Sequence, residues 1–589
     1  MEKKGSVITG TRVILNSLVA CGVDTVFGYP GGQIMPLYDA LYDYSDQIRH
    51  ILVRHEQAAV HAAQGYARAT GRTGVCFVTS GPGATNTVTG IADAMLDSTP
   101  LVVITGQVPS TILGVDSFQE INIVGVTHPI TKWNVLVRKA EELAPAIAKA
   151  MYIAQSGRPG PVLVDVTKDA QNGLAEWAGF KPCPPIRSYV PRPIADSVKI
   201  AKAAKLIDKA KRPIVIFGQG VILSGAEDVF KRFLRRSGMP AASTLLGLSA
   251  LDVSDPNYVG MIGMHGNYGP NITNHECDLI VAVGMRFDDR VTCNPDTFGA
   301  NAKIVHIDID PAEIDKVITA TVGVVGDAKS VLESLVGLIV ERDHSEWMER
   351  LKIYNQEENR LVVESVEGDG CGEIHLHQAV QAVDAAYNGE NITVTDVGQH
   401  QMVAARYTSF KRSRSLITSG GLGTMGFGLP AAIGAKIGAA HRDVVLFVGD
   451  GGIQMNIQEL ATIMQERVDV KIVLINNNYL GMVRQWQQLF FNNRYSFTPM
   501  LNPNFGLIAE ANGVGYGFCD KREDLAAAVE QMKSSEGAYL LEVKVKCNDN
   551  VLPMVAPGKS LVDIMLSDGV EAGSKCPGCK GRINEQYKK

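Results

Sequence analysis

The sequence predicts an α/β protein built from three doubly wound parallel-sheet domains, and three observations support this prediction. Short apolar runs rich in β-branched residues alternate with helix-length segments along the whole 589-residue chain, which is typical of βαβ units. Two segments of different composition divide the chain into parts, and the first and last parts resemble each other. The chain is also too long for a single hydrophobic core.

Predicted strands occur in all three parts, and a predicted helix precedes them. Val13, Ile14 and Leu18 fall at helical spacing ahead of Gly22. We therefore expect the N-terminus to be the first helix of a cytoplasmic protein and not a cleaved signal peptide. The clearest strands are expected at Val75–Thr79, Leu101–Thr105, Val162–Val166, Ile214–Phe217, Leu279–Val283, Ile304–Ile309, Val444–Val448 and Ile472–Ile475.

Two stretches separate the parts. Residues 179–193 are rich in proline, which favours extended backbone, and residues 342–372 form a charged, helix-like stretch that ends in a Gly/Asp turn. We therefore expect an N-terminal domain at 1–178, a central domain at 190–340, a third domain at 370–560 and a C-terminal tail at 561–589.

The first and third parts superpose with a constant shift of 370 residues. Cys76-Phe-Val-Thr-Ser-Gly aligns with Leu446-Phe-Val-Gly-Asp-Gly, and the helix-like stretch 56–70 aligns with 426–440. Both copies read strand, polar turn, helix, strand, which indicates a duplicated doubly wound sheet with a different, Rossmann-like sheet between the copies. Chance similarity between two ordinary βαβ units is the alternative.

Composition argues against several classes of protein. Apolar residues make up 46% and charged residues 20% of the chain, as in globular proteins. The net charge of −6 gives no reason to expect nucleic acid or an anionic membrane as a partner, and no apolar run is long enough for a membrane span. The ten cysteines are scattered, which favours reduced thiols.

The third part contains a candidate site for a metal ion and a diphosphate. Asp450 and Asn477 each follow a strand of the same βαβ unit, so both are expected at the carboxyl edge of the sheet, where such folds bind ligands. Their oxygens, with a free backbone carbonyl, suit Mg²⁺. Gly449, Gly451 and Gly452 allow the backbone to approach a diphosphate, whose charge the following helix start favours. A plain turn with Asp450 as a helix cap is the alternative.

Three other motifs lack the context that their chemistry needs. His55 and His61 are six positions apart and not four, as in a zinc-protease helix. The GxGxxG at 421–426 follows an arginine-interrupted segment where a Rossmann strand is required, which argues against NAD. The Gly558-Lys-Ser sequence lacks the first glycine of a P-loop.

Further motifs span nearly the whole chain. They are Gly28-Tyr-Pro-Gly-Gly32, Arg54-His-Glu-Gln57, Phe118-Gln-Glu120, Ser156-Gly-Arg-Pro-Gly-Pro161, Arg286-Phe-Asp-Asp-Arg290, Val397-Gly-Gln-His400, Gly481-Met-Val-Arg-Gln-Trp-Gln487 and Leu552-Pro-Met-Val-Ala-Pro-Gly-Lys559. With the Asp450/Asn477 pair, whose spacing matches the thiamine diphosphate motif, they make the sequence resemble the catalytic large subunits of the acetolactate synthase family.

The resemblance implies binding sites for thiamine diphosphate, Mg²⁺ and FAD. The first domain would bind the aminopyrimidine, the central domain FAD, and the third domain Mg²⁺ and the diphosphate. The implied metal ligands are Asp450, Asn477 and the carbonyl of Tyr479. The implied thiamine diphosphate contacts are Val397, Gly398, Gln399, His400, Gly423, Met425, Gly449, Gly451, Gly452 and Met482. The implied FAD contacts are Arg158, Gly218, Gly220, Thr244, Leu245, Met264, His265, Gly284, Arg286, Asp308 and Asp327.

The resemblance also implies a reaction. Pyruvate is decarboxylated and its hydroxyethyl unit is transferred to a second pyruvate or to 2-oxobutyrate, giving 2-acetolactate or 2-aceto-2-hydroxybutyrate in branched-chain amino acid biosynthesis. Glu56 would activate the cofactor through its pyrimidine ring, and Gln119 and Lys168 would complete the catalytic set. Phe118, Arg286 and Trp486 would contact the acceptor. The flavin would be structural, because the reaction has no net redox step.

The residues alone leave alternatives open. Glu56 also fits a solvated helix position, and Trp486 also fits a core aromatic. The same scaffold serves pyruvate oxidases, 2-oxo acid decarboxylases and flavin-free catabolic acetolactate synthases, against which the motifs at 286–290 and 481–487 argue. A catalytically dead cofactor-binding or regulatory subunit is disfavoured by Glu56 and the Asp450/Asn477 pair.

The resemblance implies partners as well. A homodimer or a dimer of dimers is expected, because in the family the first domain of one subunit faces the third domain of its partner. A small regulatory subunit is expected too. In the tail, Cys576 and Cys579 form one CxxC, which is half a zinc site. A flexible tail is the simplest interpretation, with a metal shared between subunits or redox behaviour as alternatives.

Overall fold

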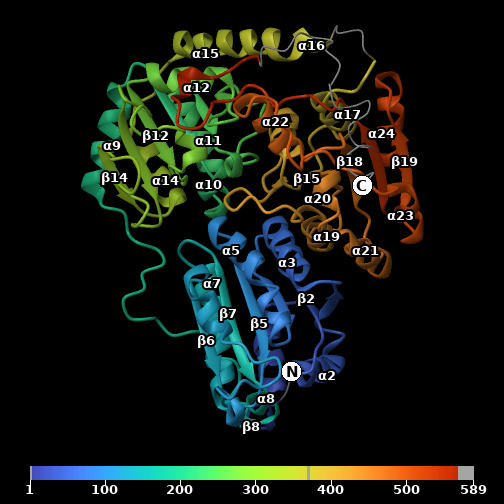
Figure 1. Cartoon of the computed structure of the whole chain (residues 1–589). Helices are drawn as coiled ribbons and strands as arrows, with labels where there is room; N and C mark the ends of the chain where they lie inside the picture. Colours follow the sequence, from blue (N-terminus) through green and yellow to red (C-terminus); the bar gives the residue numbers. More distant parts are fainter. Residues whose placement is uncertain (1–2, 368–371, 568–589) are drawn as a thin grey trace.

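Three six-stranded sheets form the core of the molecule in the computed structural model, which describes residues 3–367 and 372–567 (Figure 1). All strand pairs within these three sheets are parallel. The predicted α/β class with three parallel sheets is confirmed. The Cys576/Cys579 motif lies outside the described residues.

The first sheet is buried on both faces, as its continuous apolar strands require. Val75 and Phe77 pack into one hydrophobic cluster with helices α1 (Gly10–Ala20) and α7 (Leu143–Gln155), whereas Cys76 and Val78 pack into another with α3 (Glu56–Thr70). Its strands lie in the order β3 (Arg49–Leu52), β2 (Thr25–Tyr29), β4 (Gly74–Val78), β5 (Leu101–Gln107), β7 (Pro161–Thr167), β6 (Trp133–Val137).

The third sheet repeats this strand order, which confirms the predicted likeness of the two parts. The strands are β16 (Leu416–Ile417), β15 (Ile392–Thr395), β17 (Val444–Gly449), β18 (Lys471–Asn476), β20 (Tyr539–Lys544) and β19 (Gly515–Cys519). The register of neighbouring strands differs by one residue between the copies. Val75 pairs with Val102, whereas Val445 pairs with Lys471 and not with the residue after it.

The middle sheet has the strand order of a Rossmann fold, with β9 (Pro213–Phe217) and β12 (Leu279–Val283) at its centre. The order of its six strands reverses between these two, so a crevice opens there at the carboxyl ends of the strands. The other strands are β10 (Ala241–Ser243), β11 (Tyr258–Met261), β13 (Lys303–Asp308) and β14 (Val322–Val325). Helices α9 (Ser197–Lys209), α11 (Glu227–Ser237), α12 (Tyr268–Glu276) and α14 (Ala328–Leu338) cover this sheet.

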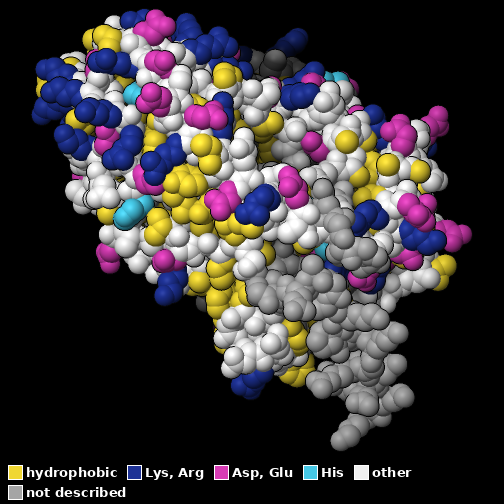
Figure 2. Space-filling view, turned by 90° about the horizontal axis from the view of Figure 1, so that it is seen from above, with side chains coloured by type: hydrophobic (Ala, Val, Ile, Leu, Met, Phe, Trp, Pro, Cys, Tyr) yellow, Lys and Arg dark blue, Asp and Glu magenta, His cyan; other side chains and the backbone are white. Residues whose placement is uncertain are grey.

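The connecting segments match their composition. The proline-rich stretch carries neither helix nor strand, and the charged stretch is helical from α15 (Ser345–Glu358) through η6 (Asn359–Glu364) to α16 (Ser365–Glu367). Lys and Arg side chains are interspersed with Asp and Glu on the face shown in Figure 2. Within the described ranges, no helix is both long enough and apolar enough to cross a membrane, and all cysteines are free thiols.

Two glycines join the first part to the third. Helix α3 packs against α19 (Gly428–Gly438), and a Cβ atom on Gly65 would lie 2.0 Å from the carbonyl oxygen of Ala431. A Cβ atom on Gly434 would lie 1.8 Å from the carbonyl oxygen of Ala62. The two helices therefore meet backbone against backbone, and Figure 1 shows them where the first and third parts adjoin.

We expect Gly434→Ala to destabilise the protein, because the new methyl group forces the two helices apart. The cost of such overpacking is about 1–3 kcal/mol, which lowers the apparent Tm by several degrees in differential scanning calorimetry. Gly337→Ala is the matched control, since Gly337 is an exposed helical glycine with open space around it. Equal effects of the two substitutions would contradict the backbone contact.

Candidate active site

A cavity of about 1270 Å³ opens where the carboxyl edges of the middle and third sheets face each other. Residues that follow β9, β12 and β13 line one side, and residues that follow β15, β17 and β18 line the other. Apart from Glu56, every residue predicted to contact thiamine diphosphate, Mg²⁺ or FAD lines this cavity, as do Arg286 and Trp486. Trp486 is half-buried against Phe490 at a ring distance of 5.4 Å, so it is not a core aromatic.

The candidate metal ligands lie at the ends of two adjacent strands. Asp450 begins α20 (Asp450–Ile453) directly after β17, and Asn477 follows β18. Asn502 donates a hydrogen bond to Asp450 Oδ2 over 2.7 Å, and the backbone N–H of Tyr479 donates to Asn477 Oδ1 over 3.0 Å. Burial raises the pKa of Asp450 to about 6. One carboxylate and one amide oxygen are thus held in a buried site, a donor set that suits Mg²⁺.

Asp396, which follows β15, shapes the side of the cavity that is predicted to hold the diphosphate. Its carboxylate accepts the backbone N–H groups of Val397 and Gly428 over 2.8 Å each, so it holds the starts of α18 (Gln399–Tyr407) and α19. His400 is buried, and desolvation lowers its pKa to about 3, so its ring is neutral. Its Nε2 atom has no hydrogen-bond partner among the described residues. A buried ring nitrogen without a partner at a cavity wall is a position where a ligand can supply the missing hydrogen bond.

Glycines shape the middle side of the cavity. A Cβ atom on Gly220 would lie 2.6 Å from the Cα atom of Gly284, so the turns after β9 and β12 pack directly on each other. Asp308 ends β13, and burial raises its pKa to about 6. Arg158 reaches in from the first part and donates to Glu313 over 2.7 Å. Glycine turns at the switch point of a Rossmann sheet, with an acidic residue on a neighbouring strand, suit a dinucleotide.

The candidates of the first part lie elsewhere. Glu56 is the first residue of α3 and accepts a hydrogen bond from Asn86 over 2.9 Å. Lys168 begins α8 (Lys168–Asn172) after β7, and Gln119 lies in the loop after β5 with a left-handed φ of 60°, which is rare outside glycine. Phe118 beside it is 84% exposed. None of these four side chains lines the cavity, so one chain presents two separate groups of candidates.

Known proteins match this chain over most of its length. The family models of the thiamine pyrophosphate enzyme N-terminal TPP binding domain, central domain and C-terminal TPP binding domain match residues 8–126, 200–335 and 396–543. The acetolactate synthase isozyme 2 large subunit of Escherichia coli is 44% identical over 558 residues, which cover 94% of this chain and 98% of that protein. The chain belongs to the acetolactate synthase large-subunit family of thiamine pyrophosphate enzymes.

Other organisms contain similar proteins. The acetolactate synthase large subunit of Lactococcus lactis is 43% identical over 93% of this chain and 95% of its own length. The probable acetolactate synthase large subunit of Methanocaldococcus jannaschii is 42% identical over 96% of this chain and 97% of its own length. The family match therefore extends over all three sheets.

Sequence reasoning missed three residues of this thiamine pyrophosphate enzyme. Asp396 directly follows the strand before Val397, so its place at the sheet edge was predictable. Asn502 lies in a loop and offered no local signal. Glu459 of η7 (Ile457–Glu459) is fully buried and accepts the backbone N–H of Arg54, two residues before Glu56, over 3.0 Å. It thus connects the third part to the segment that carries the candidate catalytic glutamate.

Glu459 is expected to make stability depend on pH. Burial raises its pKa to about 7, with Arg54 as the opposing charge. The folded state binds the Glu459 proton more tightly than the unfolded state does. The contribution of this proton to the free energy of unfolding is therefore complete below about pH 4.5 and is lost as the pH rises through about 7. Glu459→Gln should therefore gain stability relative to the wild type between pH 5 and 8, by up to about 3 kcal/mol. Urea unfolding at each pH measures the difference.

The control is Glu510→Gln, which changes an exposed glutamate of α23 (Phe505–Ala511). Its stability profile should run parallel to that of the wild type. A parallel profile for Glu459→Gln as well would disprove the role assigned to this carboxyl group.

Proposed function

We propose that this enzyme is an acetolactate synthase. It decarboxylates pyruvate and transfers the two-carbon unit to a second pyruvate or to 2-oxobutyrate, giving 2-acetolactate or 2-aceto-2-hydroxybutyrate for valine, leucine and isoleucine biosynthesis. The observation that carries the proposal is the one cavity that joins the Asp450/Asn477 edge to Arg286 and Trp486. Two acetolactate synthase large subunits that are 44% and 43% identical over nearly the whole chain support it. We expect the enzyme to work in the cytoplasm.

The cofactor assignment follows from the donor chemistry of the cavity. Asp450, Asn477 and the Tyr479 carbonyl would hold Mg²⁺, and the segment from Val397 to His400 would hold the diphosphate. The Gly218, Gly220 and Gly284 turns, with Asp308, would hold FAD. We infer a structural flavin, because two pyruvates give acetolactate and carbon dioxide without a net transfer of electrons.

Each side chain has a proposed task. Bound thiamine diphosphate supplies the nucleophilic carbon of the reaction. Glu56 would share a proton with a pyrimidine nitrogen of that cofactor, and the buried Ala58 and Ala59 would lower the local dielectric constant and strengthen the hydrogen bond. Gln119 and Lys168 orient the reacting carbonyl groups. The guanidinium group of Arg286 suits the carboxylate of a 2-oxo acid.

The acceptor specificity is assigned to an aromatic surface. Trp486 is half-buried at the cavity wall, and Phe118 from the first part of a second copy is proposed to face it. A flat indole accommodates an ethyl group as well as a methyl group, and one methylene changes the transition-state free energy by about 1–3 kcal/mol. This wall would set the preference between 2-oxobutyrate and pyruvate.

A product assay tests the reaction. Purified protein is incubated anaerobically with pyruvate, Mg²⁺ and thiamine diphosphate, with and without FAD. We expect acetolactate, and a loss of at least about a hundredfold in rate for Glu56→Gln, since general acid–base groups contribute 10²–10⁴-fold. Glu510→Gln should keep the wild-type rate. Acetaldehyde as the main product would indicate a decarboxylase, and acetate or acetyl phosphate formed only with oxygen would indicate an oxidase.

We further propose that two copies form each active site. Large apolar side chains are exposed beside both groups of candidates. Val115 and Phe118 are 66% and 84% exposed in the first part, and Phe497 and Leu501 are 93% and 75% exposed in the third. Apolar exposure of this extent is typical of an interface. A second copy would cover these side chains and bring its Glu56 to the Asp450 edge. A dimer is then the minimal active unit, with a dimer of dimers as a larger assembly.

Mixing two inactive variants tests this arrangement. Glu56→Gln and Asp450→Asn chains are unfolded, mixed in equal amounts and refolded with cofactors. A mixed dimer then contains one site with both native residues, so random pairing restores about a quarter of the wild-type activity. Each variant refolded alone is the control. If both residues of a site came from one chain, the mixture would stay inactive.

A small partner subunit is also proposed. The relatives are called large subunits, which implies a smaller companion in those proteins. We infer that this chain has a companion of the same kind.

A further inference from the structure

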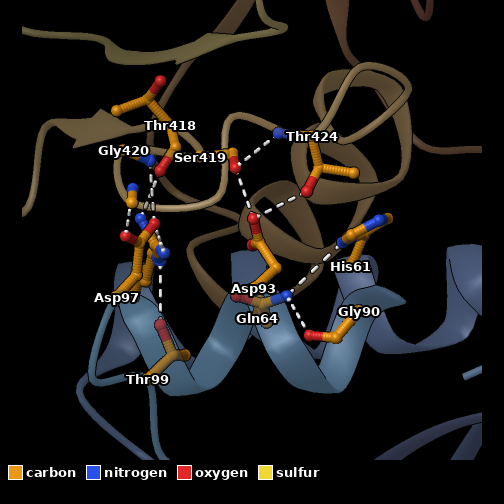
Figure 3. Close-up of polar contacts among 12 residues, drawn as sticks. His61, Gln64, Gly90, Asp93, Asp97, Thr99, Thr418, Ser419, Gly420 and Thr424 are labelled. Atoms are coloured by element: carbon orange, nitrogen blue, oxygen red, sulfur yellow. Dashed lines mark hydrogen bonds and ion pairs between the residues drawn. The ribbon is translucent and has the colours of Figure 1, made fainter. Parts of the chain in front are cut away.

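A buried polar cluster joins the first part to the loop before α19. Asp93 and Asp97 lie at one end of α5 (Val88–Leu96) and just beyond it, and both are almost completely buried. Most of their hydrogen-bond partners lie more than 300 residues away, in the segment 418–424 of the third part (Figure 3). Gln64 of α3 donates to the Gly90 carbonyl over 3.1 Å, so α5 is held to α3 as well.

Asp97 is surrounded by hydrogen-bond donors only. Its Oδ2 atom accepts from the Gly420 N–H over 2.9 Å and from Arg68 over 2.6 Å. Its Oδ1 atom accepts from the Gly421 N–H over 2.7 Å. Because both oxygens face donors, this position requires an acceptor at each atom, which only a carboxylate provides.

Asp93 has a less demanding environment. Its Oδ1 atom accepts from the hydroxyl groups of Ser419 and Thr424, the latter over 2.9 Å. Its Oδ2 atom is buried and has no partner among the described residues. The Ser419 hydroxyl in turn accepts the Thr424 backbone N–H over 2.9 Å, which closes the loop on itself (Figure 3).

Arg68 completes the cluster from α3. It donates to the Thr418 carbonyl over 2.5 Å and to the Thr99 hydroxyl over 3.1 Å. Its guanidinium group also lies 5.6 Å from the ring centre of Phe427, at the start of α19. The segment is therefore held at both ends and in the middle.

The held segment is a wall of the cofactor cavity. Ser419, Gly420, Gly421, Gly423 and Met425 all line that cavity. Gly421 lies between Asp97 and Arg286, since a Cβ atom on it would be 2.9 Å from Asp97 Oδ1 and 3.3 Å from Arg286. Gly423 has a left-handed φ of 71°. The outer side of this wall contacts α5, and its inner side faces the cavity.

We propose that Asp97 is a positioning residue that holds the segment 418–424 in the shape in which Gly423 and Met425 form the cofactor site, with Asp93 as a secondary support. The inference rests on the proposed function, because it assigns this cavity to thiamine diphosphate. Asp97 does not line the cavity. It acts through the backbone of Gly420 and Gly421, across the contact between the first and third parts.

The same substitution at two neighbouring positions tests the proposal. Asp97→Asn places an amide NH₂ against donors, whereas Asp93→Asn keeps the Oδ1 acceptor and places its NH₂ where no partner lies. We expect Asp97→Asn to weaken thiamine diphosphate binding by about tenfold or more, because a lost charge-assisted bond costs at least 1.4 kcal/mol. Asp93→Asn should stay within about threefold. Quenching of tryptophan fluorescence with Mg²⁺ and FAD present measures the dissociation constant.

Hydrogen exchange gives a second readout that does not need activity. Backbone amides of 418–426 should exchange faster in Asp97→Asn than in the wild type or Asp93→Asn. Asp165→Asn is the control, because Asp165 is buried in the first sheet and bonds Thr105 and Gln107 of the same sheet. It should leave exchange in 418–426 unchanged. Gly421→Ala disturbs the same contact from the side of the loop and should reproduce the result for Asp97→Asn. It serves as the test variant if Asp97→Asn does not fold.

Two results would overturn the proposal. One is unchanged exchange and binding in Asp97→Asn and Gly421→Ala, and the other is equal damage by Asp93→Asn. Failure of the proposed function looks different. In that case wild-type protein does not bind thiamine diphosphate, while the exchange contrast between Asp97→Asn and Asp93→Asn still reports on the segment.

Discussion

The arrangement of the molecule depends on the close approach of α3 and α19. Gly65 and Gly434 let the two helices touch through their backbones, so the first and third sheets are fixed relative to each other. Only at this distance can Asp97 bind the N–H groups of Gly420 and Gly421, and Glu459 the N–H of Arg54. Each part thus supplies a buried carboxylate to the segment that leads into the other part's helix.

The chemistry is placed by strand ends. In parallel sheets the carboxyl ends meet at one edge, so Asp450 and Asn477 are neighbours although a helix separates them in the chain. The Rossmann order of the middle sheet puts its glycine turns at the corresponding edge. The middle and third edges face each other across one cavity, whereas the edge of the first sheet, with Glu56, opens elsewhere. The division of candidates into two groups is therefore a property of sheet placement.

Local patterns in the sequence predicted much of the fold and part of the candidate site. The strands at Val75–Thr79 and Ile472–Ile475 were predicted within one or two residues, because buried parallel strands are continuous apolar runs. The Asp450/Asn477 pair followed from the same runs. The contacts of Glu459 with Arg54 and of Asp97 with Gly420 could not be predicted, because the partners lie hundreds of residues apart and no local spacing encodes them. The candidate flavin and acceptor contacts were assigned from the family resemblance, and the left-handed backbone φ of Gln119 had no signal in the sequence.

The reciprocal glycine contact has a consequence for dissecting the chain. A fragment that ends after the first sheet would leave the small-residue face of α3 uncovered, and Arg68, Asp93 and Asp97 would lose their partners in the segment 418–424. A fragment of the third part alone would leave Glu459 without the backbone N–H of Arg54 and would leave the face of α19 at Gly434 uncovered. Neither the first part nor the third part is then a self-sufficient folding unit, although each contains a complete sheet. If the two parts are expressed together as separate polypeptides, they have matching surfaces through which they can associate.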